Sequence, residues 1–134
     1  LESECARRVA RLDDDALARL DALHADLENA FAADDLEAFF AANQVFHDVL
    51  HELADNRWLR QTIIDLRRVI MLSRHHSLYS EGRLAQSLAE HRALLAAFHA
   101  RDAEGAARLM HEHIAHGRDS LLRCPAPATN TALR

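Results

Sequence analysis

The sequence contains few of the residues that close tight turns or cross-link small domains. Glycine occurs three times, proline twice and cysteine twice in 134 residues, and aromatic residues make up 5%. No apolar run approaches the roughly 20 residues that a membrane-spanning helix needs, and no signal peptide is visible. Cys5 and Cys124 lie near opposite ends without metal-type spacing, so we expect reduced thiols in a cytoplasmic protein that has no membrane partner.

An excess of positive charge is also missing. The net charge of −5 gives no reason to expect that this piece of chain binds nucleic acid directly. Apolar residues make up 49% and charged residues 28%, which is ordinary for a globular protein, and the length suits one domain with a buried core. Leucine, alanine, arginine and glutamate dominate, and these residues favour helix.

Capping signals divide the chain into six expected helices. Acidic or amide residues mark four helix starts, at 13–15, 34–35, 55–56 and 102. The expected helices span about 2–12, 13–33, 34–54, 55–76, 83–100 and 102–122. The only obvious loop is "SLYSEG" at 77–82, and the proline-containing tail 123–134 is expected to be disordered. Because strand alternation is absent, the pattern predicts an all-α antiparallel bundle.

Three of the expected helices place a histidine on the face that would enter the core. Residues advance by about 100° along a helix, so His47 shares an apolar face with phenylalanine and leucine side chains, and Asn43 lies one turn before it. His91 and His113 lie at the centres of two further apolar faces. A single core histidine usually bonds to a carbonyl or a serine, but burying four unpaired polar side chains would cost several kcal/mol. Together they predict a site for zinc, nickel or another divalent transition metal.

Two other histidines bear on this prediction. His47 and His51 are an i, i+4 pair on one helix and could chelate a metal without the others. His111 points almost opposite to His113 and is expected in solvent, so it serves as a control position.

The fourth expected helix carries arginines beside its apolar face. That face is expected to bury Ile63 and Leu66, and Arg67 and Arg74 lie on its flank. These side chains could pack their stems on the core and extend their charged ends to water. Alternatively, their guanidinium groups form a binding site for a carboxylate.

The stretches "NQVFHDVLHELADNRWL" and "LAEHRALLAAFHARDAEGAARLMHEHI" resemble the FCD domain. This is the C-terminal effector-binding domain of the FadR/VanR branch of GntR-type transcription regulators. In that family an Asp or Asn four residues before a histidine begins a metal site, a second histidine lies in an "EHR" motif, and a third follows 22 residues later. The matching positions are Asn43, His47, His91 and His113, and the resemblance covers about residues 1–122.

The resemblance implies a bundle of six helices, as in VanR-like members, or seven, as in FadR-like members. It also implies a homodimer and a metal, often zinc or nickel, that anchors a small carboxylate effector. The DNA partner would be bound by a winged helix-turn-helix domain expected upstream and absent from this chain. An arginine that often helps to hold the effector would precede Leu1. The resemblance implies a regulatory domain and no enzyme.

The expected donor set predicts the kind of effector. Three neutral imidazoles, the Asn43 amide and a divalent ion sum to a charge of about +2, which favours a hydroxy-, keto- or dicarboxylic acid. Its distal carboxylate would bind Arg67 or Arg74. A metal-dependent hydrolase is one alternative, but the neighbouring Glu90 and Glu112 both point about 100° away from the inward faces. A bundle in which a metal only stabilises the fold is the other.

Overall fold

The computed structural model describes residues 1–79 and 82–123, with side chains for residues 1–69 and 82–123. These ranges contain helices and no strand. The helices are α1 (Glu2–Val9), α2 (Asp14–Ala32), α3 (Leu36–Leu53), α4 (Arg57–Tyr79), α5 (Arg83–His99) and α6 (Ala103–Arg123). The all-α fold and the number of six helices predicted from the sequence are therefore confirmed for the described part of the chain.

The predicted helix caps form at the predicted positions. The side chains of Asp13, Asp35 and Asp102 each accept a hydrogen bond from the backbone N–H three residues later, at 2.9–3.0 Å. Asn56 does the same for Leu59 at 3.0 Å. Each such cap stabilises its helix by about 1 kcal/mol, so local chemistry sets the starts of α2, α3, α4 and α6.

Left-handed residues follow three of the described helices, at Asp34, Asp55 and Arg101, and two of these ends share one kind of very short connection. Asp34 and Arg101 have φ angles of 52° and 57°. The residues that follow them, Asp35 and Asp102, donate their backbone N–H groups to carbonyls of the helix just completed, each at 3.0 Å. This arrangement is the Schellman motif. Because the same two aspartates cap the next helix, the chain reverses at once and successive helices run antiparallel.

Two predicted boundaries are wrong. α1 ends at Val9 and not near residue 12, because the amides of Arg11 and Leu12 bond to carbonyls three residues back and form a turn. α4 continues to Tyr79, so the first three residues of the expected loop at 77–82 are helical. That stretch contains no glycine or proline to end the helix before position 82. Residues 80–81 and the tail 124–134 lie outside the described residues.

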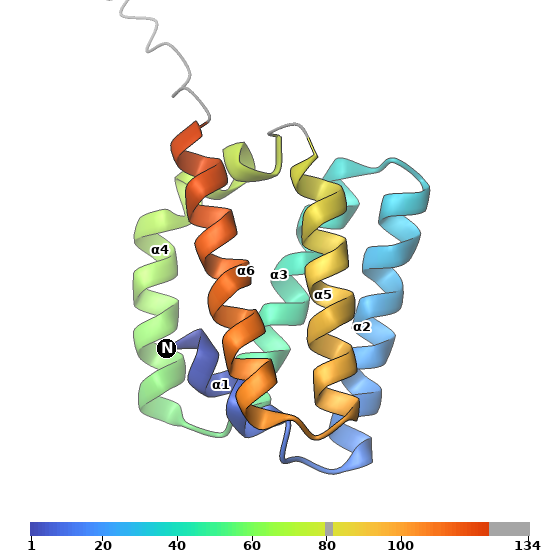
Figure 1. The fold of residues 1–134 in the computed structure, drawn as a ribbon. Helices are drawn as coiled ribbons and strands as arrows, with labels where there is room; N and C mark the ends of the chain where they lie inside the picture. Colours follow the sequence, from blue (N-terminus) through green and yellow to red (C-terminus); the bar gives the residue numbers. More distant parts are fainter. Residues whose placement is uncertain (80–81, 124–134) are drawn as a thin grey trace, which may run out of the picture.

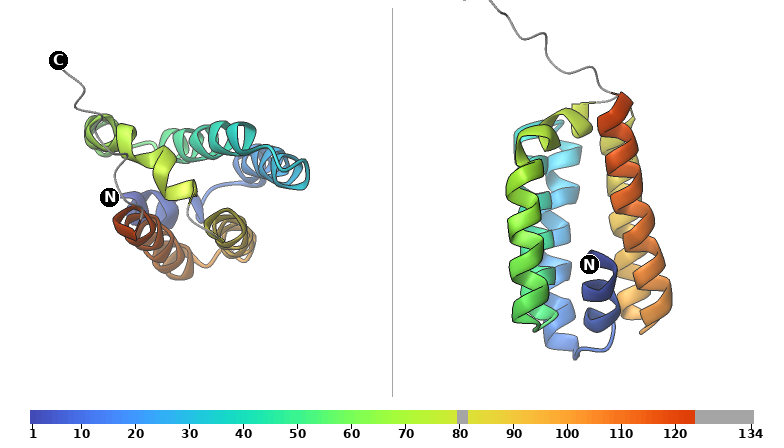
Figure 2. Two further views of the ribbon diagram at one scale, coloured as in Figure 1. Left: turned by 90° about the horizontal axis from the view of Figure 1, so that it is seen from above. Right: turned by 90° about the vertical axis from the view of Figure 1, so that its left-hand side faces the viewer.

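The five long helices form two layers with α1 between them. Helices α2, α3 and α4 make one layer and α5 and α6 the other, as Figure 2 shows from above and from the side. The short α1 packs on α6 and α3 in the space between the layers. Its first residue lies near mid-height of the bundle (Figure 1). The start of α1 therefore points toward the centre of the molecule.

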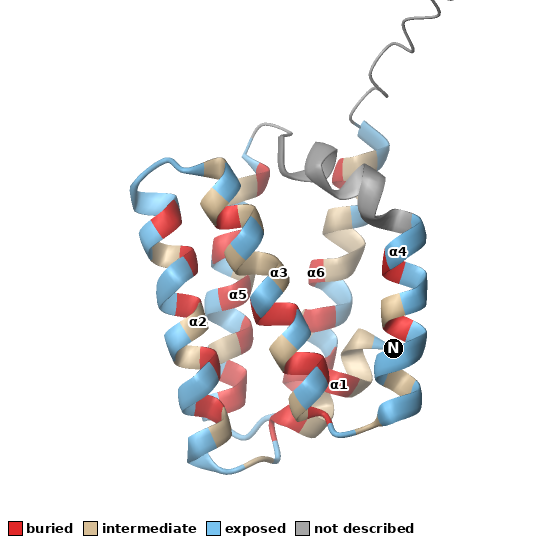
Figure 3. Cartoon of the chain, turned by 180° about the vertical axis from the view of Figure 1, so that it is seen from behind, coloured by how far each residue is buried: buried red, intermediate tan, exposed pale blue. Residues whose placement is uncertain are grey.

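Burial follows the inward faces of these helices. Fully buried side chains include Phe39, Phe46, Phe98 and Met110, and Figure 3 shows buried residues along the inner sides of α2, α3 and α5. The described part of α4 is largely exposed (Figure 3). None of the described helices is long and apolar enough to cross a membrane.

Candidate metal centre

Three histidines from three helices meet between the two layers. His47 of α3, His91 of α5 and His113 of α6 are 1%, 1% and 7% exposed. Their ring centroids lie 4.7–5.4 Å apart. One nitrogen of each ring lies within 4.8 Å of the corresponding nitrogens of the other two. The structure thus brings together the three histidines that the sequence placed on separate apolar faces.

One pair of these rings has a nitrogen–nitrogen separation that suits a shared metal. The Nε2 atoms of His47 and His113 are 3.3 Å apart. Two imidazole nitrogens bound to one tetrahedral zinc at 2.0–2.1 Å would be about 3.3–3.4 Å apart. The two rings are also nearly parallel, with an interplanar angle of 9°. The distance between the two nitrogens, and not the relative orientation of the rings, is what matches two ligands of one tetrahedral ion.

Hydrogen bonding fixes the orientation of His91. Its Nδ1 lies 2.7 Å from the carbonyl oxygen of Ser87, and because a carbonyl only accepts, Nδ1 carries the proton and Nε2 a lone pair. This Nε2 is buried and has no hydrogen-bond partner among the described residues. Burial, and after it the neighbouring His113, lowers the pKa of His91 to about 3. The ring is neutral at pH 7 and offers a lone pair that the described protein groups do not use.

A buried ion pair orients His113 in the same way. Glu90 Oε2 lies 2.5 Å from Nδ1 of His113 and 2.9 Å from Arg83 Nη1, and Glu90 Oε1 lies 2.6 Å from Nδ1 of His116. Burial alone would raise the pKa of Glu90, but His113 and Arg83 outweigh it and hold this pKa at about 2. The ionised carboxylate accepts the Nδ1 proton of His113. A carboxylate behind a histidine is the usual arrangement around metal-binding imidazoles.

Sequence reasoning missed the roles of Glu90 and Arg83. Glu90 was placed correctly away from the centre of its helical face, but that direction leads to α6, where it meets His113. Arg83 was not singled out at all, although it is only 4% exposed. Its position seven residues before Glu90, two turns along one helix face, was the available signal.

The role of Asn43 as a fourth ligand stays a prediction. Its side-chain oxygen Oδ1 is buried and has no hydrogen-bond partner among the described residues, although the residue as a whole is half-buried. An amide oxygen one turn before His47 is a suitable donor for a borderline transition metal.

His51 is more buried than the sequence indicated. The sequence analysis places it on the same helix as His47 without predicting its burial, and it is 2% exposed. Its Nε2 lies 3.5 Å from Glu2 Oε1, and Glu2 Oε2 lies 3.7 Å from His47 Nδ1. Glu2, His47 and His51 therefore form a second group with the spacing of metal ligands. The missed element is α1, because sequence periodicity could not show that Glu2 would reach α3.

Arg67 lies inside the bundle and Leu66 does not. Arg67 is 8% exposed and Leu66 is 50% exposed, so the predicted burial of Leu66 is wrong. Arg67 follows the buried Ile63 by one turn, and its Nε and Nη2 both lie 3.1 Å from Oε1 of Glu2. The carboxylate that this guanidinium binds is thus supplied by the chain itself. The side chain of Arg74 lies outside the described residues.

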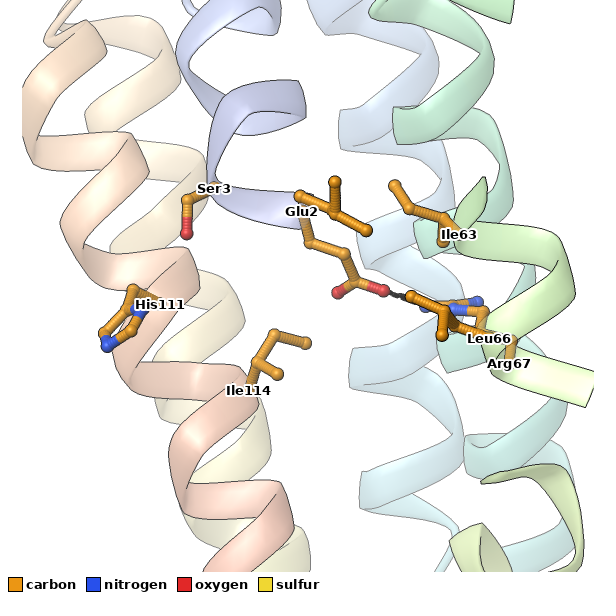
Figure 4. Close-up of a pocket in the computed structure, with 8 residues that line it drawn as sticks. Glu2, Ser3, Ile63, Leu66, Arg67, His111 and Ile114 are labelled. Carbon is orange, nitrogen blue, oxygen red and sulfur yellow. Dashed lines mark hydrogen bonds and ion pairs between the residues drawn. The ribbon is translucent and has the colours of Figure 1, made fainter. Parts of the chain in front are cut away.

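A pocket opens beside the Glu2–Arg67 pair. Its volume is about 250 Å³, and Figure 4 shows Glu2 extending across it toward Arg67. The lining residues come from α1, α4 and α6 and are Leu1, Glu2, Ser3, Ile63, Leu66, Arg67, His111 and Ile114. His111 is exposed, as expected for the control position. The buried face of this pocket carries the charged pair, while Ile63, Leu66 and Ile114 make much of its wall apolar.

Comparison with known protein families agrees with this architecture. The family model described as the FCD domain matches residues 1–116. No curated protein sequence matches the chain at a significant level. The matched region includes α1, the three converging histidines, Asn43 and Arg67. The chain therefore belongs to the FCD domain family, the regulatory effector-binding domains of GntR-type transcription regulators.

Proposed function

We propose that this domain binds a divalent transition metal, zinc or nickel, through Asn43, His47, His91 and His113. The metal-loaded domain senses a small carboxylic acid, and the acid changes DNA binding by the parent protein. The observation that carries the proposal is the convergence of imidazole nitrogens between the layers. The Nδ1 atoms of His91 and His113 are hydrogen-bonded to acceptors, so both rings carry their lone pair on Nε2; that of His91 has no partner among the described residues, and that of His113 faces His47 Nε2.

The chain's own groups explain why an acid would be recognised. The proposed ligands are neutral, so they leave the charge of a bound cation uncompensated. A divalent ion at this place would supply positive charge and open coordination positions for an acid's oxygens. Glu90 and Ser87 keep the rings of His113 and His91 from turning. The effector class that fits is a hydroxy-, keto- or dicarboxylic acid.

Arg67 is the proposed partner of a distal carboxylate of the effector. The Glu2 carboxylate lies next to the guanidinium of Arg67 and also next to the rings of His47 and His51. Arginine binds carboxylates through paired N–H groups and keeps its charge at all physiological pH values. Arg74, seven residues and about two turns further along α4, is proposed as a second effector-binding residue.

The position of Glu90 argues against a hydrolase. A metal-dependent hydrolase needs a general base that is close to the metal and able to take a proton. Glu90 is the carboxylate nearest to His113, but it already accepts hydrogen bonds from Arg83, His113 and His116. Those contacts hold its pKa at about 2. A carboxylate with so low a pKa is a poor base, so the arrangement suits ligand binding better than catalysis.

Dimerisation belongs to the proposal as well. The described part of α4 exposes Trp58, Leu66 and Val69, at 74%, 50% and 80%. Large apolar side chains grouped on one helix often mark a protein interface. A homodimer is expected in sedimentation experiments at micromolar concentrations, and a monomer for the wild type would contradict this part.

Calorimetry tests the sensing function directly. Malate, which carries both a hydroxyl and two carboxylates, is titrated into metal-loaded protein and into chelator-stripped protein, with the neutral diamide of malate as control. We expect malate binding only by the metal-loaded form and no binding of the diamide. Equal malate binding by both forms would overturn the proposal. Metal-dependent melting without any acid affinity would instead support a metal that only stabilises the fold.

A further inference from the structure

The Glu2 carboxylate occupies the guanidinium edge that an acid would use. Nε and Nη2 of Arg67 both lie 3.1 Å from one oxygen of Glu2, Oε1. The remaining nitrogen, Nη1, contacts Gln44 Oε1 at 3.4 Å and Asp48 Oδ1 at 3.3 Å. Nε donates a hydrogen bond to this oxygen, whereas Nη2 lies near it without a hydrogen bond to any described residue. A carboxylate that approached this edge in the plane would give each nitrogen its own oxygen, which is the stronger geometry.

A second cation is a poor explanation of the same cluster. Glu2, His47 and His51 have the spacing of metal ligands. Yet the charge of Glu2 is already balanced by the permanent positive charge of Arg67. A divalent ion placed at Glu2 would be close to the guanidinium and would be repelled by it. The cluster is better understood as an anion site of Arg67, His47 and His51 in which the anion is Glu2.

The pocket gives an external anion a route to the Glu2–Arg67 pair. The Glu2 side chain is 12% exposed, and it lines the pocket of about 250 Å³ together with Arg67. An external acid entering the pocket would reach Arg67 by the side that Glu2 now faces (Figure 4). Glu2 belongs to the first turn of α1. A change limited to this first turn would move the Glu2 side chain to water and leave the buried half of α1 in place.

We propose that Glu2 is an internal competitor for the effector's carboxylate, and that the acid binds Arg67 by displacing it. This inference rests on the proposed sensing function. Displacement of Glu2 explains why the site would select anionic ligands. Removing Glu2 without a replacement would leave Arg67 with a buried and incompletely paired charge, which is strongly unfavourable. Only a ligand that brings its own carboxylate can make the exchange, so neutral analogues fail. The start of α1 then reports that the site is occupied.

The variant Glu2→Gln tests the competition. Glutamine keeps the shape of the side chain and removes its charge, so it competes less well for Arg67. If Glu2 holds the site in about nine of ten molecules, the apparent Kd for an acid is raised about tenfold. Malate should therefore bind metal-loaded Glu2→Gln about tenfold more tightly than metal-loaded wild type. Glu4→Gln is the control, because Glu4 lies on the same helix and, within residues 1–69 and 82–123, its side chain hydrogen-bonds to Arg7 and Arg8 and not to Arg67.

The outcomes separate this inference from the function on which it rests. Metal-dependent malate binding of equal strength in wild type and Glu2→Gln would overturn the competition and leave the sensing function standing. Malate binding that ignores the metal would contradict the sensing function, and a tighter Kd in Glu2→Gln would still support the competition. No malate binding by either protein would overturn both. Should Glu2→Gln fail to fold, Glu2→Asp, with its shorter reach to Arg67, carries the same expectation of a lower Kd.

Discussion

His47 and His113 place their Nε2 atoms 3.3 Å apart, although 66 residues separate them in the chain. The contact joins α3 in one layer of the bundle to α6 in the other. Two buried imidazole nitrogens that face each other need a proton or a cation between them, because two lone pairs repel. A metal at this point would connect the layers, and a ligand that binds only the folded state stabilises that state.

Removal of one proposed ligand should weaken metal binding severely. His113→Ala takes away a nitrogen donor of the buried cluster, and we expect zinc affinity to fall by more than the roughly 10–100-fold typical of losing a supporting residue. His111→Ala, two residues earlier and exposed, should bind zinc like the wild type. Competition titration with a coloured chelator measures both. Unchanged zinc affinity in His113→Ala would eliminate this histidine as a ligand.

The carboxylate behind His113 should matter although it does not touch a metal. Glu90→Gln replaces the anionic acceptor of the Nδ1–H hydrogen bond with a neutral amide, so the tautomer of the ring is held less firmly and the ring loses part of its basicity. We expect a loss of about 10–100-fold in zinc or nickel affinity. Glu112→Gln is the matched control, since Glu112 also adjoins a proposed ligand but is exposed. Similar affinities of the two variants, measured by calorimetry, would show that Glu90 has only a structural role.

The charge of the fourth proposed ligand should set the balance between metal and acid. Asn43→Asp adds a negative charge beside a cation, so metal affinity should rise by about tenfold or more, which corresponds to about 1.4 kcal/mol. The same charge should weaken malate binding to the loaded protein. Asn43→Leu, which supplies no oxygen, should lower metal affinity. If all three proteins hold nickel equally in equilibrium dialysis, Asn43 is not a ligand.

Buried Cys5 should make stability depend on pH in the alkaline range. Burial, and after it the charge of Glu2, raises the pKa of the thiol from 9.0 to about 11. Below pH 9 the thiol is protonated in both states. Between pH 9 and pH 11 the unfolded chain loses the proton and the folded protein keeps it. The free energy of unfolding therefore falls as pH rises through this window, by up to about 2–3 kcal/mol.

The composition makes this effect measurable. All sixteen basic residues are arginines, so no lysine titrates between pH 9 and pH 11. Urea unfolding of chelator-stripped protein carrying Cys124→Ser leaves Cys5 as the one thiol of the chain, and addition of Cys5→Ala should remove the part of the pH slope that this thiol contributes. A slope that persists in the Cys5→Ala protein would assign the dependence to another group.

Local sequence signals were sufficient for the helices. The caps at Asp13, Asp35, Asn56 and Asp102 act within three residues, so their chemistry can be read without knowing the fold. Helical periodicity likewise placed His47, His91 and His113 on inward faces, and all three are buried. The end of α4 was predicted less well, because the stretch near residue 77 has neither a strong helix stop nor a strong helix preference.

Local signals could not predict which helix a given side chain would meet. Periodicity indicates how a side chain points from its own helix axis, but not which neighbour stands there. Glu90 points away from the centre of its helical face and meets His113 of α6. Arg67 points into the bundle and Leu66 does not, because the guanidinium of Arg67 pairs with the carboxylate of Glu2 there.

The sequence by itself determined six helices, their caps and a histidine on each of three apolar faces, because these depend on interactions spanning only a few residues. Only the tertiary structure decided that the three rings meet at one point. It alone also decided that α1 inserts between the layers and pairs Glu2 with Arg67, 65 residues away. Such pairings depend on how the layers pack and on which buried charge needs a partner, and both are properties of the assembled bundle.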